Sequence, residues 1–113
     1  MTLSERQRYF ARLVGQLLTY AATHGIDVTL GEAWRPPYTA HHDAELGIGI
    51  ERSLHCDRLA IDLNVYAGGS YSTNPLDYRA LGDYWRELDP ACTWGGSFGD
   101  YDHFSLTIGD GRA

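Results

Sequence analysis

Three side chains of this sequence, His55, Asp62 and His103, are of the types that bind zinc in enzymes. In a catalytic zinc site, three protein ligands leave the fourth position to a water molecule, and the metal lowers the pKa of that water to about 7. Asp100, three residues before His103, could then accept the proton of that water. In outline, these four residues describe a metallohydrolase site.

Each candidate also has a simpler explanation, which the residues alone leave open. A single histidine at a strand edge is often a surface or hydrogen-bonded residue, and Asp100 and Asp102 could both be solvated turn residues. Asp102 neighbours His103 and should point the opposite way on an extended chain, so Asp100 is the better candidate for a base. Arg35 could bind a substrate carboxylate or a developing oxyanion. Judged alone, it is better explained as an ion-pair partner of Glu32 or another acid.

The two cysteines, Cys56 and Cys92, are too few for a disulfide framework, and we expect free thiols. Cys56 next to His55 could suggest a thiol nucleophile, but neighbouring side chains on an extended chain diverge. His41 and His42 are expected on the surface of a loop.

Length and composition fit one compact domain over residues 1–113. The formal net charge of -6 and the lack of a basic stripe argue against nucleic-acid binding, which needs clustered lysines and arginines. No stretch approaches the roughly 20 apolar residues of a membrane span. The first residues are polar and acidic where a signal peptide has an apolar run, so we expect synthesis and residence in the cytoplasm.

The first half of the chain predicts one helix and one strand, followed by a long loop. Apolar residues recur at steps of three and four over Ser4–His24, which begins with capping-box spacing and is followed by Gly25 as a C-terminal cap. The pattern of Asp27–Trp34 predicts a strand. Pro36–Ile50 has no clear period and is expected to be a loop without secondary structure, of the kind that often has a function.

The second half predicts two strands that carry the candidate site. Alternate residues of Arg58–Tyr66 are apolar, and Asp62 falls on the other face. In His103–Ile108, the histidine likewise lies opposite the apolar residues. If the two strands pair, the aspartate and this histidine can converge. His55 lies an odd number of residues before Asp62, so a turn just after His55 is needed to bring it to the same point.

A second helix is expected between these strands. Asn74 can cap it with Pro75 at its first position, and Asp89-Pro90 ends it. Its buried stripe is expected to consist of Tyr78, Leu81, Trp85 and Leu88.

Two motifs and two shorter segments together follow the pattern of one known family. Ser53, His55, Ala60 and Asp62 match, in order and spacing, the motif Ser-x-His-x-x-Gly-x-Ala-x-Asp, and Asp100 with His103 matches an acid followed three residues later by histidine. The chain thereby resembles the VanY-like family of zinc D-alanyl-D-alanine carboxypeptidases and L-alanyl-D-glutamate endopeptidases.

The two shorter segments extend the resemblance from about Gly31 to Leu106. Trp94-Gly-Gly-Ser-Phe resembles a segment common in phage members, and Gly31-Glu-Ala-Trp-Arg35-Pro resembles the region with the family's substrate-binding arginine. Arg58 stands where the motif has glycine, a change that resembles a phage and prophage branch, and Ser97 stands where an acid is frequent. These departures concern a turn and a loop and leave every ligand in place.

The resemblance implies a small α+β fold with an antiparallel sheet, a central zinc site and helices packed on one side. It implies that His55, Asp62 and His103 bind Zn2+, that Asp100 is the general base, and that Arg35 meets the substrate. The substrate class would be the stem peptide of peptidoglycan, with amide bonds involving D-amino acids or the L-Ala–D-Glu link.

Two further substrate contacts and a biological setting complete the interpretation. The resemblance implies that Ser53 helps to position the peptide, and the residues Trp94-Gly95-Gly96 would themselves let backbone approach the substrate closely. The leading interpretation is a phage or prophage endolysin, a monomer held in the host cytoplasm until its release to the cell wall. The alternative is a noncatalytic zinc domain of the same fold, with a structural or binding role in a phage particle. The presence of Asp100 argues against it, because a structural site usually closes with a fourth protein ligand and needs no base.

Overall fold

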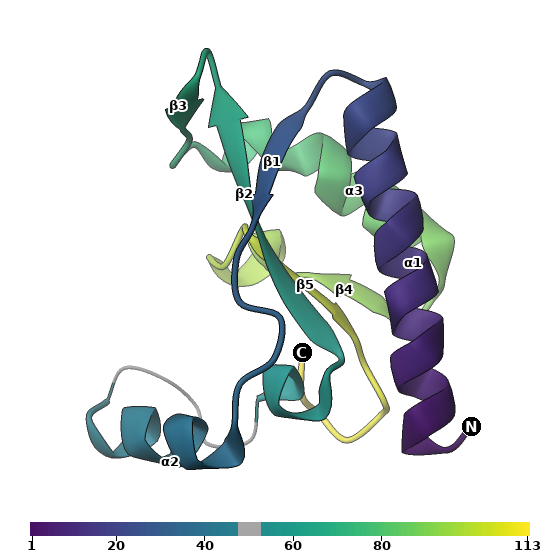
Figure 1. The fold of residues 1–113 in the computed structure, drawn as a ribbon, viewed down its shortest axis with the longest axis vertical. Helices are drawn as coiled ribbons and strands as arrows, with labels where there is room; N and C mark the ends of the chain where they lie inside the picture. Colours follow the sequence, from purple (N-terminus) through teal and green to yellow (C-terminus); the bar gives the residue numbers. More distant parts are fainter. Residues whose placement is uncertain (48–52) are drawn as a thin grey trace.

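The computed structural model describes residues 1–47 and 53–113, apart from the side chains of residues 40 and 43. Within these residues, the longer helices α1 (Leu3–Thr23) and α3 (Arg79–Leu88) lie close together, and α2 (Pro37–Glu45) stands apart from them (Figure 1). The strands are β1 (Asp27–Leu30), β2 (Ala60–Ala67), β3 (Ser70–Tyr71), β4 (Cys92–Trp94) and β5 (His103–Leu106). The 3-10 turns are η1 (Leu54–Asp57), η2 (Pro75–Asp77) and η3 (Gly95–Phe98). No helix in this part of the chain is both long enough and apolar enough to cross a membrane.

The strands form one antiparallel sheet in the order β1-β2-β5-β4, with β3 paired to β2. Strand β2 is the centre of the sheet, because its first half pairs with β5 and its second half with β1 and β3. Together with the helices, this sheet confirms the predicted α+β class and places Asp62 directly opposite His103.

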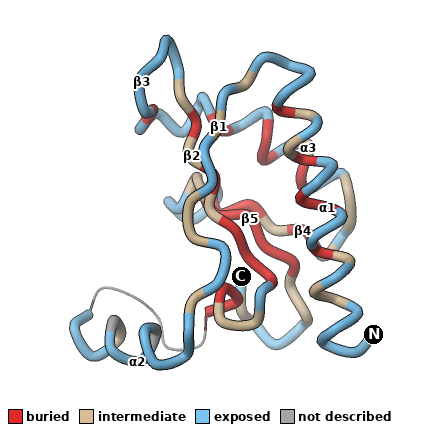
Figure 2. The backbone as a smooth tube through the Cα atoms, in the orientation of Figure 1, coloured by how far each residue is buried: buried red, intermediate tan, exposed pale blue. Residues whose placement is uncertain are grey.

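The core lies between the sheet and the pair of helices α1 and α3. Phe10 of α1 packs edge-on against Trp85 of α3, with ring centroids 5.8 Å apart, and Trp85 also meets Phe104 of β5. Burial follows the inner faces of both helices and the length of β2 and β5 (Figure 2). The stripe predicted for the second helix is confirmed, since its first three members are fully buried and Leu88 packs against the core.

Several element boundaries differ from the sequence prediction. The capping box of α1 joins Thr2 to Glu5 through reciprocal hydrogen bonds of 3.1 Å and 3.0 Å, so the box expected at Ser4 is wrong. Gly25 does follow the end of α1, with a φ of 67°. Asn74 caps η2 instead of α3, which begins at Arg79.

The strand boundaries also shift, and two strands were missed. The first strand ends at Leu30, well before Trp34, and β2 begins at Ala60 instead of Arg58. Strands β3 and β4 had no counterpart in the prediction, because two or three residues are too few to show an alternating pattern.

The prediction that Pro36–Ile50 is a loop without secondary structure is wrong for its first part. Pro37–Glu45 forms α2, with proline in its first turn, where the missing N–H costs nothing. Tyr38 is 80% exposed, and none of the described α2 side chains is buried. A helix that buries no face has no reason to show an apolar period, so its sequence carried no signal. Residues 48–50 of the predicted loop lie outside the described residues.

Gly82→Ala is expected to destabilise the fold by about 1–3 kcal/mol, because a Cβ at this buried position of α3 would collide with the indole ring of Trp94. The ring cannot move aside easily, since its Nε1 donates a 2.6 Å hydrogen bond to the Tyr101 carbonyl. Gly15→Ala on the exposed face of α1 is the matched control. It meets no atom within 4 Å and should stabilise by about 0.5–1 kcal/mol. Urea unfolding of both variants measures the two shifts, and equal shifts would contradict this packing.

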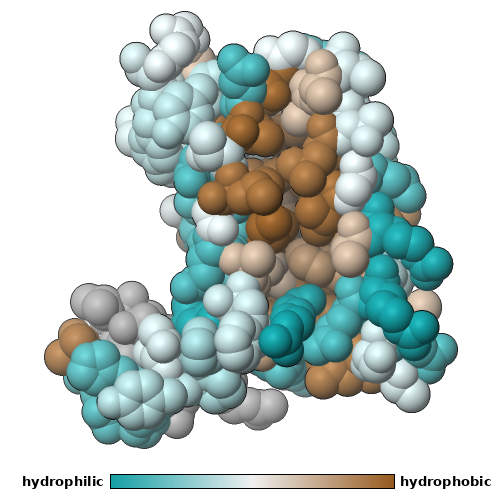
Figure 3. Space-filling view, viewed as in Figure 1, coloured by the Kyte–Doolittle hydropathy of each residue, from teal (hydrophilic) through white to brown (hydrophobic). Residues whose placement is uncertain are grey.

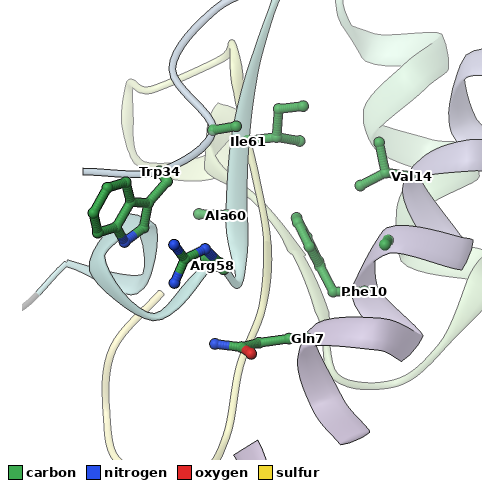
Figure 4. Close-up of a pocket in the computed structure, with 9 residues that line it drawn as sticks. Gln7, Phe10, Val14, Trp34, Arg58, Ala60 and Ile61 are labelled. Carbon is green, nitrogen blue, oxygen red and sulfur yellow. The ribbon is translucent and has the colours of Figure 1, made fainter. Parts of the chain in front are cut away.

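Apolar side chains also gather at the surface between α1 and β2 (Figure 3). A cavity of about 380 Å³ opens there, lined among others by Phe10, Val14, Arg58 and Ile61 (Figure 4). Phe10 and Val14 project from α1, and Ile61 comes from β2 (Figure 4). None of the three candidate metal ligands lines this cavity, so it is separate from the candidate site.

Candidate metal centre

Asp62 and His103 are brought together by the pairing of β2 with β5. They are opposite residues in the register, and Asp62 Oδ1 lies 3.7 Å from His103 Nδ1. Opposite residues on one face of an antiparallel pair are close neighbours. The predicted convergence of these two side chains is confirmed.

His55 reaches the same point because η1 turns the chain just before β2. The Ser53 hydroxyl caps this turn by accepting a 3.1 Å hydrogen bond from the His55 N–H. Arg58 ends the turn with a left-handed φ of 56°. As a result, His55 Nε2 lies 3.2 Å from Asp62 Oδ1, which confirms the predicted turn.

The three side chains form one compact cluster at the edge of the core. One ligand atom from each lies within 4.8 Å of the other two. The histidines are buried, at 3% exposure for His55 and 6% for His103, whereas the Asp62 side chain is 25% exposed. The cluster therefore opens to solvent on the side of the aspartate.

Contacts on the outer side of each ring orient it toward Asp62. His55 Nδ1 lies 3.4 Å from the Ala33 carbonyl, and His103 Nε2 lies 3.1 Å from the backbone oxygen of Ala113. These oxygens only accept, so the two outer nitrogens donate. His55 Nε2 and His103 Nδ1 face Asp62, and they are the nitrogens that a metal ion would bind in place of a proton.

Asp62 is the anionic member of the cluster. Burial alone would raise the pKa of its carboxyl, but the hydrogen bonds and charges of His103 and His55 outweigh burial and lower the pKa to about 2. The pKa of His103 is raised, since its contact with Asp62 and the charge of Asp100 outweigh the lowering effect of burial. The carboxylate is thus ionised at neutral pH and ready to bind a cation.

This donor set fits Zn2+. Two imidazole nitrogens and one carboxylate oxygen converge, so one metal ion at their centre could be bound by all three. A set of three nitrogen and oxygen ligands is typical of catalytic zinc sites, which keep one position for water or substrate. A structural site would more often be closed by a fourth protein ligand.

Asp100 and Asp102 form a pair of carboxyls at the rim of the cluster. Asp100 Oδ2 lies 3.9 Å from His103 Nδ1, and its side chain is 54% exposed. Burial, a hydrogen bond with Asp100 and the charges of Asp62 and Asp100 raise the pKa of Asp102 to about 6. The expectation that Asp102 points away is wrong, because it lies in the turn before β5, where strand alternation does not apply.

Arg35 forms an ion pair with Glu32. This is the explanation that the sequence favoured when Arg35 was judged alone. Its Nε donates a 2.9 Å hydrogen bond to Glu32 Oε1, its Nη2 contacts the same oxygen, and this pairing raises the pKa of Arg35. Glu32 Oε1 also lies 3.8 Å from His55 Nδ1, and the Arg35 N–H donates to the His55 carbonyl at 3.2 Å. Glu32 therefore links the arginine to a candidate ligand. Sequence reasoning named it only as a partner of Arg35 and missed its closeness to His55.

Trp94 and the glycines after it pack inside the protein. Trp94 is 7% exposed, and a Cβ on Gly96 would collide with its ring. A Cβ on Gly95 would collide with the Asp100 carbonyl. These glycines are needed for close internal contacts, and the expectation that they also let a substrate approach stays a prediction. A substrate contact by Trp94 or by Ser53, which is 4% exposed, stays a prediction.

Arg58→Gly is expected to be more stable than Arg58→Ala by about 1 kcal/mol. Both variants lose the guanidinium that lies 4.4 Å from the centre of the Trp34 ring, but only alanine keeps a Cβ in the left-handed conformation. Urea unfolding of the two zinc-free variants measures the difference, and equal midpoints would show that the backbone here is not strained.

Comparison with known proteins shows a likeness to solved structures. A scan against models of protein families found no match for this chain, and neither did a search of curated proteins. The chain is similar to the crystal structure of the L-Ala D-Glu endopeptidase ChiX from Serratia marcescens, with a TM-score of 0.72 at 24% sequence identity. The match covers 97% of this chain and 90% of that chain. The protein thus has an α+β fold similar to that of ChiX, with a buried His-Asp-His cluster as its candidate metal centre.

Proposed function

We propose that this protein is a zinc-dependent peptidase that hydrolyses an amide bond in the stem peptide of peptidoglycan. The observation that carries the proposal is the cluster of His55, Asp62 and His103 with Asp100 at its open side. The similarity to ChiX, an L-Ala D-Glu endopeptidase, supports the substrate class. It also makes the L-Ala–D-Glu link the first bond to test.

The metal ion and the Asp100 carboxylate would have separate roles in the reaction. A zinc ion held by the three ligands supplies a Lewis acid that lowers the pKa of a coordinated water to about 7. Asp100 is exposed and within 3.9 Å of a ligand nitrogen, so its carboxylate can accept a proton at that place and pass it to the leaving amine.

Arg35 is proposed to bind a substrate carboxylate or the developing oxyanion. Its Nε and Nη2 are taken by Glu32, which fixes the plane of the guanidinium, and Nη1 makes no hydrogen bond with any described residue. A planar, permanently charged guanidinium whose Nη1 is still available as a hydrogen-bond donor is suited to orient a carboxylate of the peptide substrate. The Arg35 N–H bond to the His55 carbonyl places this group beside the metal ligands.

In biological terms, such an enzyme would serve a phage or prophage as an endolysin. It would act as a monomer, made in the host cytoplasm and released to the cell wall at lysis. The support is the resemblance of the Trp94–Phe98 segment and of the run around Arg58 to phage members of the VanY-like family.

The test is digestion of Gram-negative peptidoglycan by the purified protein, with and without a chelator. Released fragments are identified by mass spectrometry, and their new termini name the bond. Peptide release that stops with chelator and returns with added Zn2+ is the expected result. No release from several wall types, with zinc bound to the protein, would overturn the proposal and favour the noncatalytic zinc domain.

A further inference from the structure

The residues that follow β5 fold back onto the candidate metal centre. Gly109 and Gly111 have φ values of 81° and 88°, a conformation that side chains other than glycine rarely adopt, and they reverse the chain direction. The C-terminal end of the chain consequently lies beside η1, near the start of β2 (Figure 1). This segment, residues 109–113, is called the tail below.

Arg112 fastens the tail to the turn that carries His55. Its Nη1 lies 2.7 Å from Asp57 Oδ2, and Asp57 is the last residue of η1. Its Nε and Nη2 each lie 2.7 Å from Asp110 Oδ2 within the tail. The Arg112 side chain is only 15% exposed, so these ion pairs are better shielded from solvent than ordinary surface pairs.

The fastened tail supplies the outer hydrogen-bond partner of His103. The residue after Arg112 is Ala113, whose backbone oxygen lies 3.1 Å from His103 Nε2. Nδ1 is the ring nitrogen that faces Asp62 and Asp100, so a metal would bind His103 through Nδ1 while Nε2–H donates to the tail. The orientation of the His103 ring as a ligand therefore depends on where the tail is held.

We propose that Arg112 is a positioning residue of the metal centre, which holds the backbone oxygen of Ala113 against His103 Nε2 by binding Asp57 and Asp110. The inference rests on the zinc site of the proposed function but on no property of the reaction. Arg112 thereby connects the surroundings of two of the candidate ligands. It binds the tail, which contacts His103, to η1, which carries His55. Outer-shell partners of this kind typically contribute 10- to 100-fold to metal affinity.

Zinc affinity of the Arg112→Ala variant tests the proposal. Competition with a chromophoric chelator should show an affinity about 10- to 100-fold weaker than that of the unmodified protein. Arg112→Lys, which can keep one ion pair, should recover part of the loss. Arg79→Ala is the matched control, because Arg79 forms an exposed ion pair with Asp83 on α3, and its zinc affinity should not change.

Hydrogen exchange at the His103 ring gives a readout that a general loss of stability would not imitate. In NMR of the zinc-bound protein, the Nε2–H of His103 should exchange slowly with solvent because the Ala113 oxygen accepts it, and in zinc-saturated Arg112→Ala it should exchange faster. If Arg112→Ala fails to fold, Asp57→Asn removes one arm of the contact, and it should weaken zinc binding in the same direction. Folded variants with unchanged zinc affinity and unchanged Nε2–H exchange would overturn the proposal. Zinc affinity is measured without substrate, so a failure to digest peptidoglycan would leave this result standing.

Discussion

Asp100→Asn is expected to lower kcat/KM for peptide release by about 100- to 10,000-fold while zinc remains bound. The amide has almost the shape of the carboxylate but cannot accept a proton, so it removes the base and leaves the ligands untouched. Asp100 sits at the rim, 3.9 Å from His103 Nδ1 and 54% exposed, so the fold should not depend on its charge. The measurement is the rate of fragment release by mass spectrometry, alongside zinc content by elemental analysis.

Asp83→Asn is the control for this variant, because Asp83 is an exposed acid on α3 that pairs with Arg86. It should release peptide at the rate of the unmodified protein. Asp100→Asn that loses zinc would mean that Asp100 supports the metal instead of acting as a base. Unchanged turnover in Asp100→Asn would leave the noncatalytic zinc domain, or another base, as the explanation.

Asp62→Ala is expected to abolish peptide release and to leave the protein without stable zinc. The substitution removes the single anionic ligand and the group that both histidines contact, at 3.2 Å and 3.7 Å. It also leaves two buried imidazoles without their partner, which should cost about 1–3 kcal/mol of stability even without metal. Zinc content after dialysis and the rise of Tm on adding Zn2+ measure the loss. A ligand that binds only the folded state raises Tm, so the variant should show no rise.

Asn64→Ala is the matched control for the ligand variant. Asn64 lies on the same face of β2, two residues further along, and is outside the cluster. It should keep its zinc, and its Tm should rise with the metal. Stable zinc in Asp62→Ala would contradict the assignment of Asp62 as a ligand.

The parts of the site that follow strand periodicity could be predicted from the sequence. Alternation in two segments placed Asp62 and His103 on faces that could meet, and their pairing in β2 and β5 is as expected. The turn at His55 followed from an odd spacing between residues. These inferences worked because a paired strand has one rigid repeat, which fixes the direction of every side chain.

The missed features lie where no such repeat operates. Helix α2 buries no described side chain, so its sequence showed no period. Asp102 was assigned a direction from strand alternation, although it belongs to the turn before β5. The contacts of Glu32 and Arg112 with the surroundings of the ligands join segments far apart in the chain, and no local pattern encodes them.

One backbone hydrogen bond closes the chain around the segment that carries α2. The Arg35 N–H donates to the His55 carbonyl, so Arg35 is held next to a candidate ligand. Helix α2 buries none of its described side chains, so the core does not depend on it. The entropic cost of closing a loop grows by only about 0.6 kcal/mol for each doubling of its length. Helix α2 can therefore be lengthened, shortened or exchanged, in evolution or in the laboratory, while Arg35 and His55 keep their places.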